Sequence, residues 1–129
     1  MKRKELYLEL SDFYQKKRDF FRNAIQSSRF KLLKCEGTYF QLATYSRISE
    51  EKDTEFVRRM TRDMGVAAIP VSVFYPIPAY RQKGYLNKSI NLPNTEKLCK
   101  TVLSLPMHTA LDETTLSYIC DNILSFFKK

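Results

Sequence analysis

The chain has 129 residues, a length at which one domain is expected and about two thirds of the unfolded surface can be buried. An apolar fraction of 43% with few glycines and prolines is typical of a globular protein and excludes a disordered or collagen-like chain. The net charge of +8 would suit nucleic acid, but the basic residues are dispersed and no nucleic-acid motif accompanies them. A basic binding module is therefore only a second alternative.

The cysteines Cys35, Cys99 and Cys120 are odd in number and far apart, which favours reduced thiols in a cytosolic protein. Their spacing does not suit a metal site, and the single His108 completes no ligand set. No apolar run is long enough for a membrane span, and the first residues are too polar for a signal peptide. We therefore expect a soluble cytoplasmic protein with no metal and no membrane partner.

The first predicted element is an amphipathic helix from Lys4 to about Gln26. Its apolar residues recur at steps of three and four: Leu6, Leu10, Phe13, Phe20, Phe21, Ala24 and Ile25. The basic residues Lys16, Lys17, Arg18 and Arg22 lie on the opposite face of this pattern. We interpret the basic run as the solvent-exposed side of the helix.

Two strands are predicted next, over residues 29–35 and 38–45, with Gly37 marking the connection between them. A polar loop over 46–52 follows, and Asp53 is expected to cap a second helix. The buried stripe of that helix is predicted to be Phe56, Val57, Met60 and Met64. Gly65 fits the position just after the helix, where a positive φ costs glycine least.

Residues 66–74 are predicted to form a third strand, at an edge or beside a bulge because of Pro70. A long irregular connection follows over 75–93, and Asn94 is expected to cap a short helix. An extended segment over 103–106 leads to a last helix, which Asp112 caps. The buried stripe of the last helix is predicted to be Leu116, Ile119, Cys120, Ile123, Leu124 and Phe127. Cys99 and Cys120 are therefore expected to be inert core thiols.

The alternation of helices and strands predicts an α/β fold, an α+β two-layer sandwich. A mixed sheet of three or four strands is expected, covered on one face by about four helices. The first two strands should pair antiparallel because they are adjacent in sequence. We expect one domain over residues 1–129.

Three blocks of the first half, over 13–22, 35–41 and 65–75, resemble the small C-terminal domain of fold-type I, pyridoxal-phosphate-dependent aminotransferases. The similarity is to the methionine and kynurenine aminotransferase branch of class I and covers about residues 5–75. The blocks occur in the order of that family, with the expected helix between the second and the third.

The second half, about residues 76–129, is similar to another branch, the DegT/DnrJ/EryC1/StrS sugar aminotransferases. The stretches 75–85, 92–108 and 111–119 carry this resemblance. The two halves meet near residues 73–78. We infer an engineered chimera of two homologous small domains, with natural recombination or an unfamiliar family as the alternatives.

The resemblance implies that the catalytic groups of the enzyme lie elsewhere. In these families the Schiff-base lysine, the acidic partner of the pyridine nitrogen and the phosphate cup belong to the large domain. The arginine that binds the substrate carboxylate is missing from its expected place, and Arg81 nearby belongs to the other pattern. We therefore expect no catalytic residue, no pyridoxal phosphate bound by this chain alone and no enzymatic activity. The alternative is a fragment or subunit of an active aminotransferase.

The resemblance also identifies residues that would face the active-site mouth of an intact relative: Gly37, Thr38, Tyr39, Ser72 and Tyr75. Considered as residues alone, they are better explained as strand residues and packing aromatics. A small domain separated from its large domain exposes an apolar surface, and exposed patches promote association. We therefore expect self-association through the former interdomain surface, with the following candidates: Tyr39, Tyr45, Phe74, Tyr75 and Tyr80.

Overall fold

The structure, a computed structural model, describes residues 8–86 and 89–127. The predicted start of the first helix, including Leu6, lies outside these residues. In chain order the elements are α2 (Leu10–Ala24), β1 (Lys31–Leu32), β2 (Phe40–Thr44), α3 (Asp53–Met64), β3 (Ile69–Pro70), α4 (Val71–Phe74), η1 (Ala79–Arg81), η2 (Lys83–Tyr85), α5 (Pro93–Thr101), β4 (Val102–Pro106) and α6 (Glu113–Phe126).

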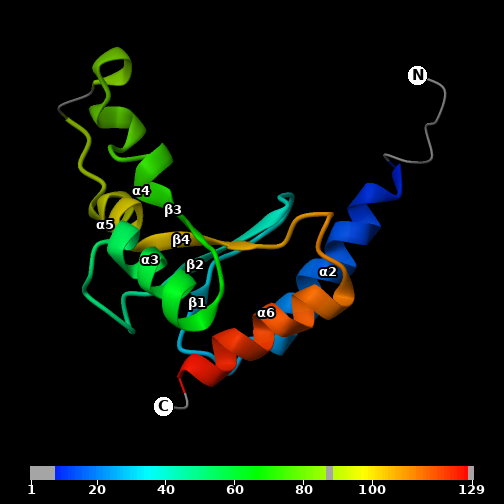
Figure 1. Cartoon of the computed structure of the whole chain (residues 1–129). Helices are drawn as coiled ribbons and strands as arrows, with labels where there is room; N and C mark the ends of the chain where they lie inside the picture. Colours follow the sequence, from blue (N-terminus) through cyan, green and yellow to red (C-terminus); the bar gives the residue numbers. More distant parts are fainter. Residues whose placement is uncertain (1–7, 87–88, 128–129) are drawn as a thin grey trace.

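The four strands form one sheet in the order β1-β2-β4-β3, and each neighbouring pair runs antiparallel. The predicted α/β class and the strand number are confirmed, as is the antiparallel pairing of the first two strands. The sheet is antiparallel rather than mixed because β4 lies between β2 and β3. Those two strands, joined through α3, run in the same direction but do not pair with each other (Figure 1).

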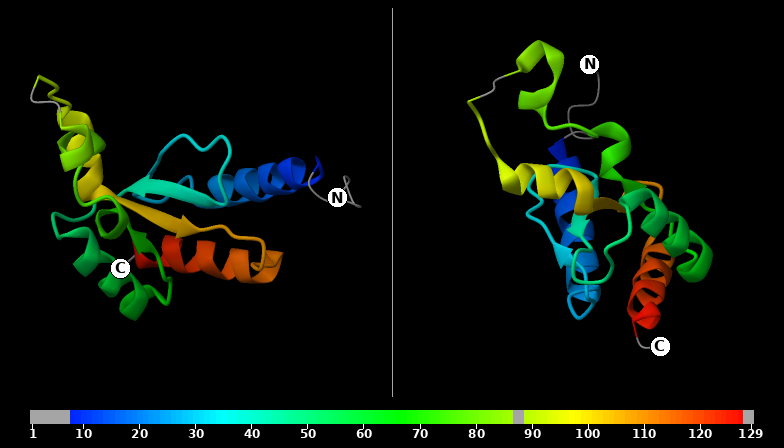
Figure 2. Two further views of the ribbon diagram at one scale, coloured as in Figure 1. Left: turned by 90° about the horizontal axis from the view of Figure 1, so that it is seen from above. Right: turned by 90° about the vertical axis from the view of Figure 1, so that its left-hand side faces the viewer.

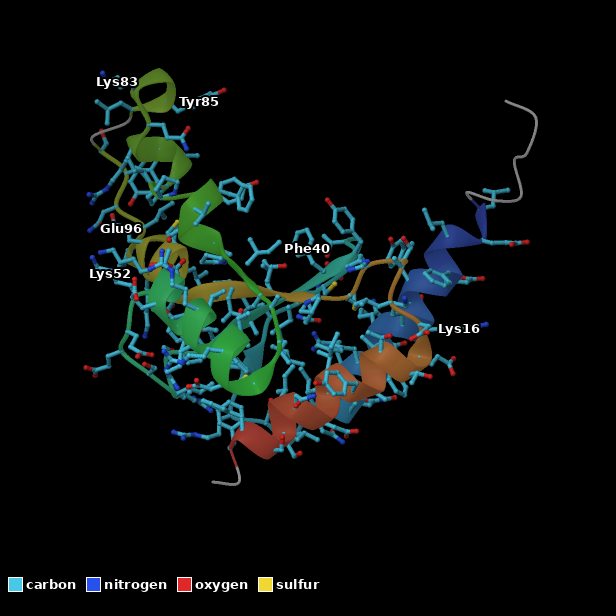
Figure 3. All side chains as sticks on the ribbon, viewed as in Figure 1. Lys16, Phe40, Lys52, Lys83, Tyr85 and Glu96 are labelled. Atoms are coloured by element: carbon cyan, nitrogen blue, oxygen red, sulfur yellow. The ribbon has the colours of Figure 1, made fainter. Side chains whose placement is uncertain are left out.

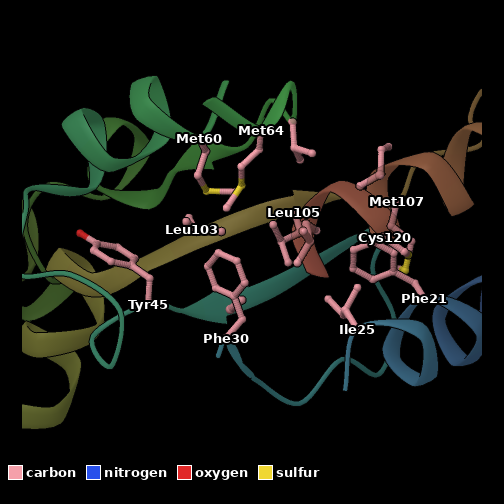
Figure 4. Close-up of a cluster of buried hydrophobic side chains, with 14 of the residues drawn as sticks. Phe21, Ile25, Phe30, Tyr45, Met60, Met64, Leu103, Leu105, Met107 and Cys120 are labelled. Carbon is pink, nitrogen blue, oxygen red and sulfur yellow. The ribbon is translucent and has the colours of Figure 1, made fainter. Parts of the chain in front are cut away.

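One face of the sheet carries the hydrophobic core, and helices α2, α3 and α6 cover it (Figures 1 and 2). The sheet contributes Ala43, Leu103 and Leu105, each fully buried. In Figure 4 the side chains of Met60 and Met64 lie above these strands. The predicted stripes of α3 and of α6 from Leu116 to Ile123 are confirmed as core. This arrangement matches the two-layer sandwich that the sequence predicted.

Helix α2 orients its faces differently from the prediction. Within the helix only Phe21 is buried, whereas Leu10, Phe13 and Phe20 are exposed. The buried and half-buried residues follow helical spacing: Tyr14, Lys17, Arg18, Phe21, Arg22, Ala24 and Ile25. Phe13 and Phe20 form a separate stripe, which the apolar pattern alone merged with the first.

Of the four basic residues predicted on the solvent side of α2, Lys16 is exposed, whereas Lys17, Arg18 and Arg22 are half-buried. Arg22 donates to the Leu33 carbonyl at 2.8 Å and to Oε1 of the fully buried Gln41 at 2.9 Å. Lys17 donates to the backbone carbonyls of His108 and Leu111. Burial lowers the pKa of Lys17, an effect that Asp112 partly offsets. These long side chains fasten α2 to the rest of the fold through backbone carbonyl groups, two of which also accept from other donors.

The third predicted strand is much shorter than expected. It ends at Pro70, and residues 71–74 form the short helix α4. The cause is a contact with α3: the Ser72 backbone N–H and hydroxyl donate to the buried carboxylate of Asp53 at 2.8 and 2.6 Å. Two donors of one residue are thus directed to one carboxylate, which fixes a helical turn where the sequence favours an extended chain.

The helix ends test the predicted capping residues. Asp112 caps α6, since its Oδ1 accepts from the Thr115 N–H at 2.7 Å, as predicted. Gly65 ends α3 with φ +69°, also as predicted. Asp53 is instead the first residue of α3, and α5 begins at Pro93, one residue before Asn94. A proline fits the first helical turn because its missing N–H is not needed there.

Gly65 and Gly37 offer a matched pair of glycine substitutions. We expect Gly65→Ala to lower the free energy of unfolding by about 1 kcal/mol, because φ +69° strains any residue with a Cβ. Gly37 has no positive φ, and a Cβ there would meet nothing within 4 Å. Gly37→Ala should therefore change stability by at most a few tenths of a kcal/mol or raise it slightly. Urea unfolding of both variants tests this; equal losses would contradict it.

A projecting segment, which we call the arm, comprises residues 71–86 and contains α4, η1 and η2 (Figure 1). Its middle is fastened to α5: the Tyr80 hydroxyl donates to Glu96 at 2.5 Å, and Arg81 pairs with the same carboxylate. The Tyr80 hydrogen bond, followed by the charge of Arg81, lowers the pKa of Glu96. The predicted irregular connection thus contains two ordered helical turns within its described part.

Candidate functional site

A groove of about 390 Å³ lies between α2 and the loop that joins β1 to β2. The loop wall includes three of the residues predicted at the substrate mouth: Gly37, Thr38 and Tyr39. The helix wall consists of residues spaced by one turn or two along α2, which are Leu10, Ser11, Tyr14, Gln15 and Arg18. Cys35 and Glu36 complete the lining.

Local hydrogen bonds give the loop wall its shape. The Thr38 hydroxyl donates to the Phe40 carbonyl at 2.7 Å, and the Cys35 sulfur lies 3.4 Å from the same hydroxyl. Arg18 donates from Nη1 to the Cys35 carbonyl at 3.2 Å, which connects the two walls. The Tyr39 ring is exposed and packs edge to face on Phe40. The groove is therefore held open by contacts at its base.

The charges around the groove largely cancel in neighbouring pairs. Arg18 contacts Asp19 at 2.7 Å, and Lys34 contacts Glu36 at 2.8 Å. What remains is a set of hydroxyl, amide and thiol groups between two aromatic rings. Such a lining can contact a polar substrate or a chain segment. It places no base beside a nucleophile, the pairing that nucleophilic catalysis requires.

The other two predicted mouth residues lie elsewhere. Ser72 belongs to α4 and bonds Asp53, while Tyr75 is exposed on the arm. The structure thus brings together Gly37, Thr38 and Tyr39 but not the remaining pair. The sequence did not predict the α2 wall, because Leu10 was assigned to a buried stripe and Arg18 to the solvent-exposed face of the helix. Their spacing of four and seven residues becomes informative only once α2 is known to lie beside the loop.

Of the residues predicted on an exposed interdomain surface, some are exposed and others are buried. Tyr39, Phe74 and Tyr75 are exposed, but Tyr45 is fully buried, so its prediction was wrong. The Tyr45 ring stacks on Phe56 with centroids 4.3 Å apart, and its hydroxyl donates to backbone carbonyls. Burial, reinforced by nearby carboxylates, raises the pKa of Tyr45 to about 12. Tyr80 is half-buried against α5.

The cysteines are all free. Cys120 is buried in α6, and burial together with the charge of Asp121 raises the pKa of its thiol to about 11, in agreement with an inert core thiol. Cys99 is only half-buried, because α5 places no residue in the core. Within the described residues, no group of three or more His, Cys, Asp or Glu side chains is arranged to hold a metal ion. Nor is any described helix long and apolar enough to cross a membrane.

Comparison with known proteins supports both resemblances. The methionine aminotransferase of Escherichia coli is 53% identical over 74 residues, which are 57% of this chain and 19% of that enzyme. The UDP-2-acetamido-2-deoxy-3-oxo-D-glucuronate aminotransferase of Pseudomonas aeruginosa is 39% identical over 54 residues, 42% of this chain and 15% of that enzyme. The chain thus spans about a fifth or less of these relatives.

The solved structures give the same result for the fold. The crystal structure of YbdL from Escherichia coli, for which a methionine aminotransferase function was identified, superposes with a TM-score of 0.73 and 36% identity. The superposition covers 96% of this chain and 27% of YbdL. The model of the DegT/DnrJ/EryC1/StrS aminotransferase family matches residues 14–124, across both halves of the sequence. Since that match takes in most of its length, this chain belongs to the DegT/DnrJ/EryC1/StrS aminotransferase family.

Proposed function

We propose that this chain is a small-domain scaffold of the aminotransferase fold that does not transaminate by itself. The observation that supports the proposal is how small a part of a related enzyme this chain covers. Nearly the whole chain superposes on YbdL, yet it accounts for only 27% of that protein. A chain of this extent supplies one layer of the enzyme and leaves out the rest. The alternative, a fragment that contributes to an active aminotransferase, shares this observation and differs in requiring a partner.

The described residues do not fit pyridoxal phosphate. A Schiff-base cofactor needs a lysine in a desolvated pocket, and no lysine lines the groove. Lys17 is the described lysine with a lowered pKa, but two backbone carbonyls already accept from its ammonium group. A phosphate is favoured at a helix N-terminus that lacks carboxylates. The four long helices instead each carry an acidic residue in the first turn: Asp12, Asp53, Glu96 and Glu113.

The second face of the sheet supports a role as one layer of a larger assembly. Residues directly opposite each other on paired strands share a face. By the observed register this puts Phe40 opposite Pro106, and both Leu42 and Ile69 opposite Ser104. This face is largely apolar: Phe40, Leu42 and Pro106 are half-buried and Ile69 is exposed, whereas Val102, opposite Thr44 on the same face, is buried. Figure 3 shows Phe40 on the side of the sheet toward the open space between the arm and α2. A second domain seated there would bury it.

We further propose that the chain joins two branches of the superfamily. The matches to the methionine and the sugar-nucleotide aminotransferases are together about as long as the chain, and neither alone covers 60% of it. Small domains of related fold share the strand order, so a junction near residues 73–78 would keep the core intact. In the structure this junction falls on α4 and the start of the arm, outside the buried core cluster.

The absence of cofactor binding can be measured directly. We expect the chain mixed with pyridoxal phosphate to show no specific Schiff-base absorbance band. After borohydride reduction, mass spectrometry should find low labelling spread over many exposed lysines. The matched control is the same chain in urea, which should be labelled at the same lysines to a similar extent. A band in the folded chain alone, reducible to one modified lysine, would overturn the proposal.

Binding to nucleic acid would distinguish a basic binding module from a scaffold. Phosphate contacts to nucleic acid make retention depend steeply on salt. We expect no retention on immobilised DNA or RNA at low salt beyond that of an unrelated protein of equal net charge. The dispersed basic residues, several of them tied to carbonyls or carboxylates, support this expectation.

A further inference from the structure

A second hollow lies at the start of α2, beside the loop that joins β4 to α6. It has a volume of about 250 Å³ and is lined by Glu9, Leu10, Phe13 and Thr109. Leu10 and Phe13 are 44% and 43% exposed, so the hollow offers apolar side chains to solvent. Glu9 forms an ion pair with none of the described residues, which leaves a carboxylate at its rim.

The tip of the arm has the complementary chemistry. Tyr85 is 74% exposed, the largest exposed fraction among the large apolar side chains described. Lys83 stands two residues away on the same turn, also exposed and without an ion-pair partner among the described residues. Figure 3 shows both side chains at the far end of the arm. An aromatic ring beside a cation matches an apolar hollow beside a carboxylate.

The two features cannot meet within one molecule. The arm and α2 extend from opposite ends of the sheet as the two limbs of a V (Figures 1 and 2). The tip of one limb is therefore available only to the hollow of another molecule. If two copies exchange their tips about a two-fold axis, each makes the same contact and the assembly closes.

We propose that two copies of this chain associate reciprocally, with Tyr85 of each seated in the α2 hollow of the other and Lys83 paired with Glu9. The net charge of +8 on each copy opposes association, so the local complementarity has to outweigh a general repulsion. Because each contact is small, we expect a dissociation constant on the order of 100 µM.

Sedimentation equilibrium of the full chain from about 10 µM to about 1 mM spans the expected transition. Lys83→Glu and Glu9→Lys should each weaken the dimer about tenfold, since each places like charges opposite each other. The double variant, with both charges reversed, should restore the dimer. Tyr85→Ser should weaken it by a similar factor. Lys52→Glu makes the same change of charge on an exposed residue far from both features and should leave the dimer unchanged.

Circular dichroism of each variant shows whether α2 is retained, because Glu9 precedes the helix directly. Should Glu9→Lys unfold α2, Lys83→Glu and Tyr85→Ser still test the contact from the arm. A monomer at all concentrations would overturn the proposal. So would a dimer that Lys83→Glu and Tyr85→Ser leave unchanged, or a pair of charge reversals that fails to restore association in a folded chain.

Discussion

Replacing Phe21 with alanine is expected to lower the free energy of unfolding by about 3–5 kcal/mol, the range for removing a buried aromatic ring. Phe21 is fully buried and is the single residue within α2 that is. It therefore accounts for most of the apolar attachment of this helix to the core. Domains of this size are stabilised by about 5–15 kcal/mol in total, so the loss brings the fold close to its limit.

The neighbouring residue supplies the control for this prediction. Phe20 has the same side chain and lies next to Phe21 in the helix, but its side chain is 44% exposed. Phe20→Ala should cost less than about 1 kcal/mol, because little apolar area is buried there and alanine favours the helix. Urea unfolding followed by circular dichroism measures both variants. Similar losses for the two variants would mean that α2 does not lie as the structure has it.

The contrast between these two residues shows where sequence information ends. The spacing of apolar residues predicted that residues 10–24 form a helix, and they do. It could not say which of two overlapping stripes faces the sheet. That choice depends on Arg22, whose contact with the buried Gln41 requires the helix and the strand to be already side by side. Basic side chains were assigned to solvent because the pattern carries no information about carbonyl partners across the fold.

Signals within a few residues were more reliable. The Asp112 cap and the positive φ of Gly65 depend only on neighbours in the chain, and both were predicted correctly. The antiparallel pairing of β1 with β2 follows from their adjacency in the sequence and was also predicted. The order of the sheet was not, because β4 inserts between strands that the sequence joins through α3.

The candidate site shows the same division. The resemblance predicted Gly37, Thr38 and Tyr39 at a substrate mouth, and these residues line the groove. The opposite wall, with Tyr14 and Arg18, was not recognised, because no local pattern indicates which loop lies beside a helix face. A similar limit explains Tyr45, predicted at the surface by its type but buried by the stacking of Phe56.

The second large effect is expected at Asp53, whose carboxylate is 4% exposed and holds the start of the arm. Its two oxygens accept from the Ser72 N–H at 2.8 Å, from the Ser72 hydroxyl at 2.6 Å and from the Thr54 N–H at 2.9 Å. A hydrogen bond to a charged group contributes about 1.5–3 kcal/mol to the free energy of unfolding. A buried donor left without an acceptor lowers that free energy further, because it has also lost its hydrogen bond to water. We expect Asp53→Ala to lower the free energy of unfolding by about 2–4 kcal/mol.

Ser72→Ala gives the matched comparison, because it removes the hydroxyl but keeps the backbone N–H bond to the carboxylate. It should cost about 1–2 kcal/mol. The double variant should cost less than the sum of the two single variants by about 1 kcal/mol, since both remove the same hydroxyl contact. Limited proteolysis should cut Asp53→Ala within the arm faster than the unaltered chain, because Ser72 lies at the arm's base. Additive losses together with unchanged proteolysis would show that α4 is held by its apolar neighbours and not by this carboxylate.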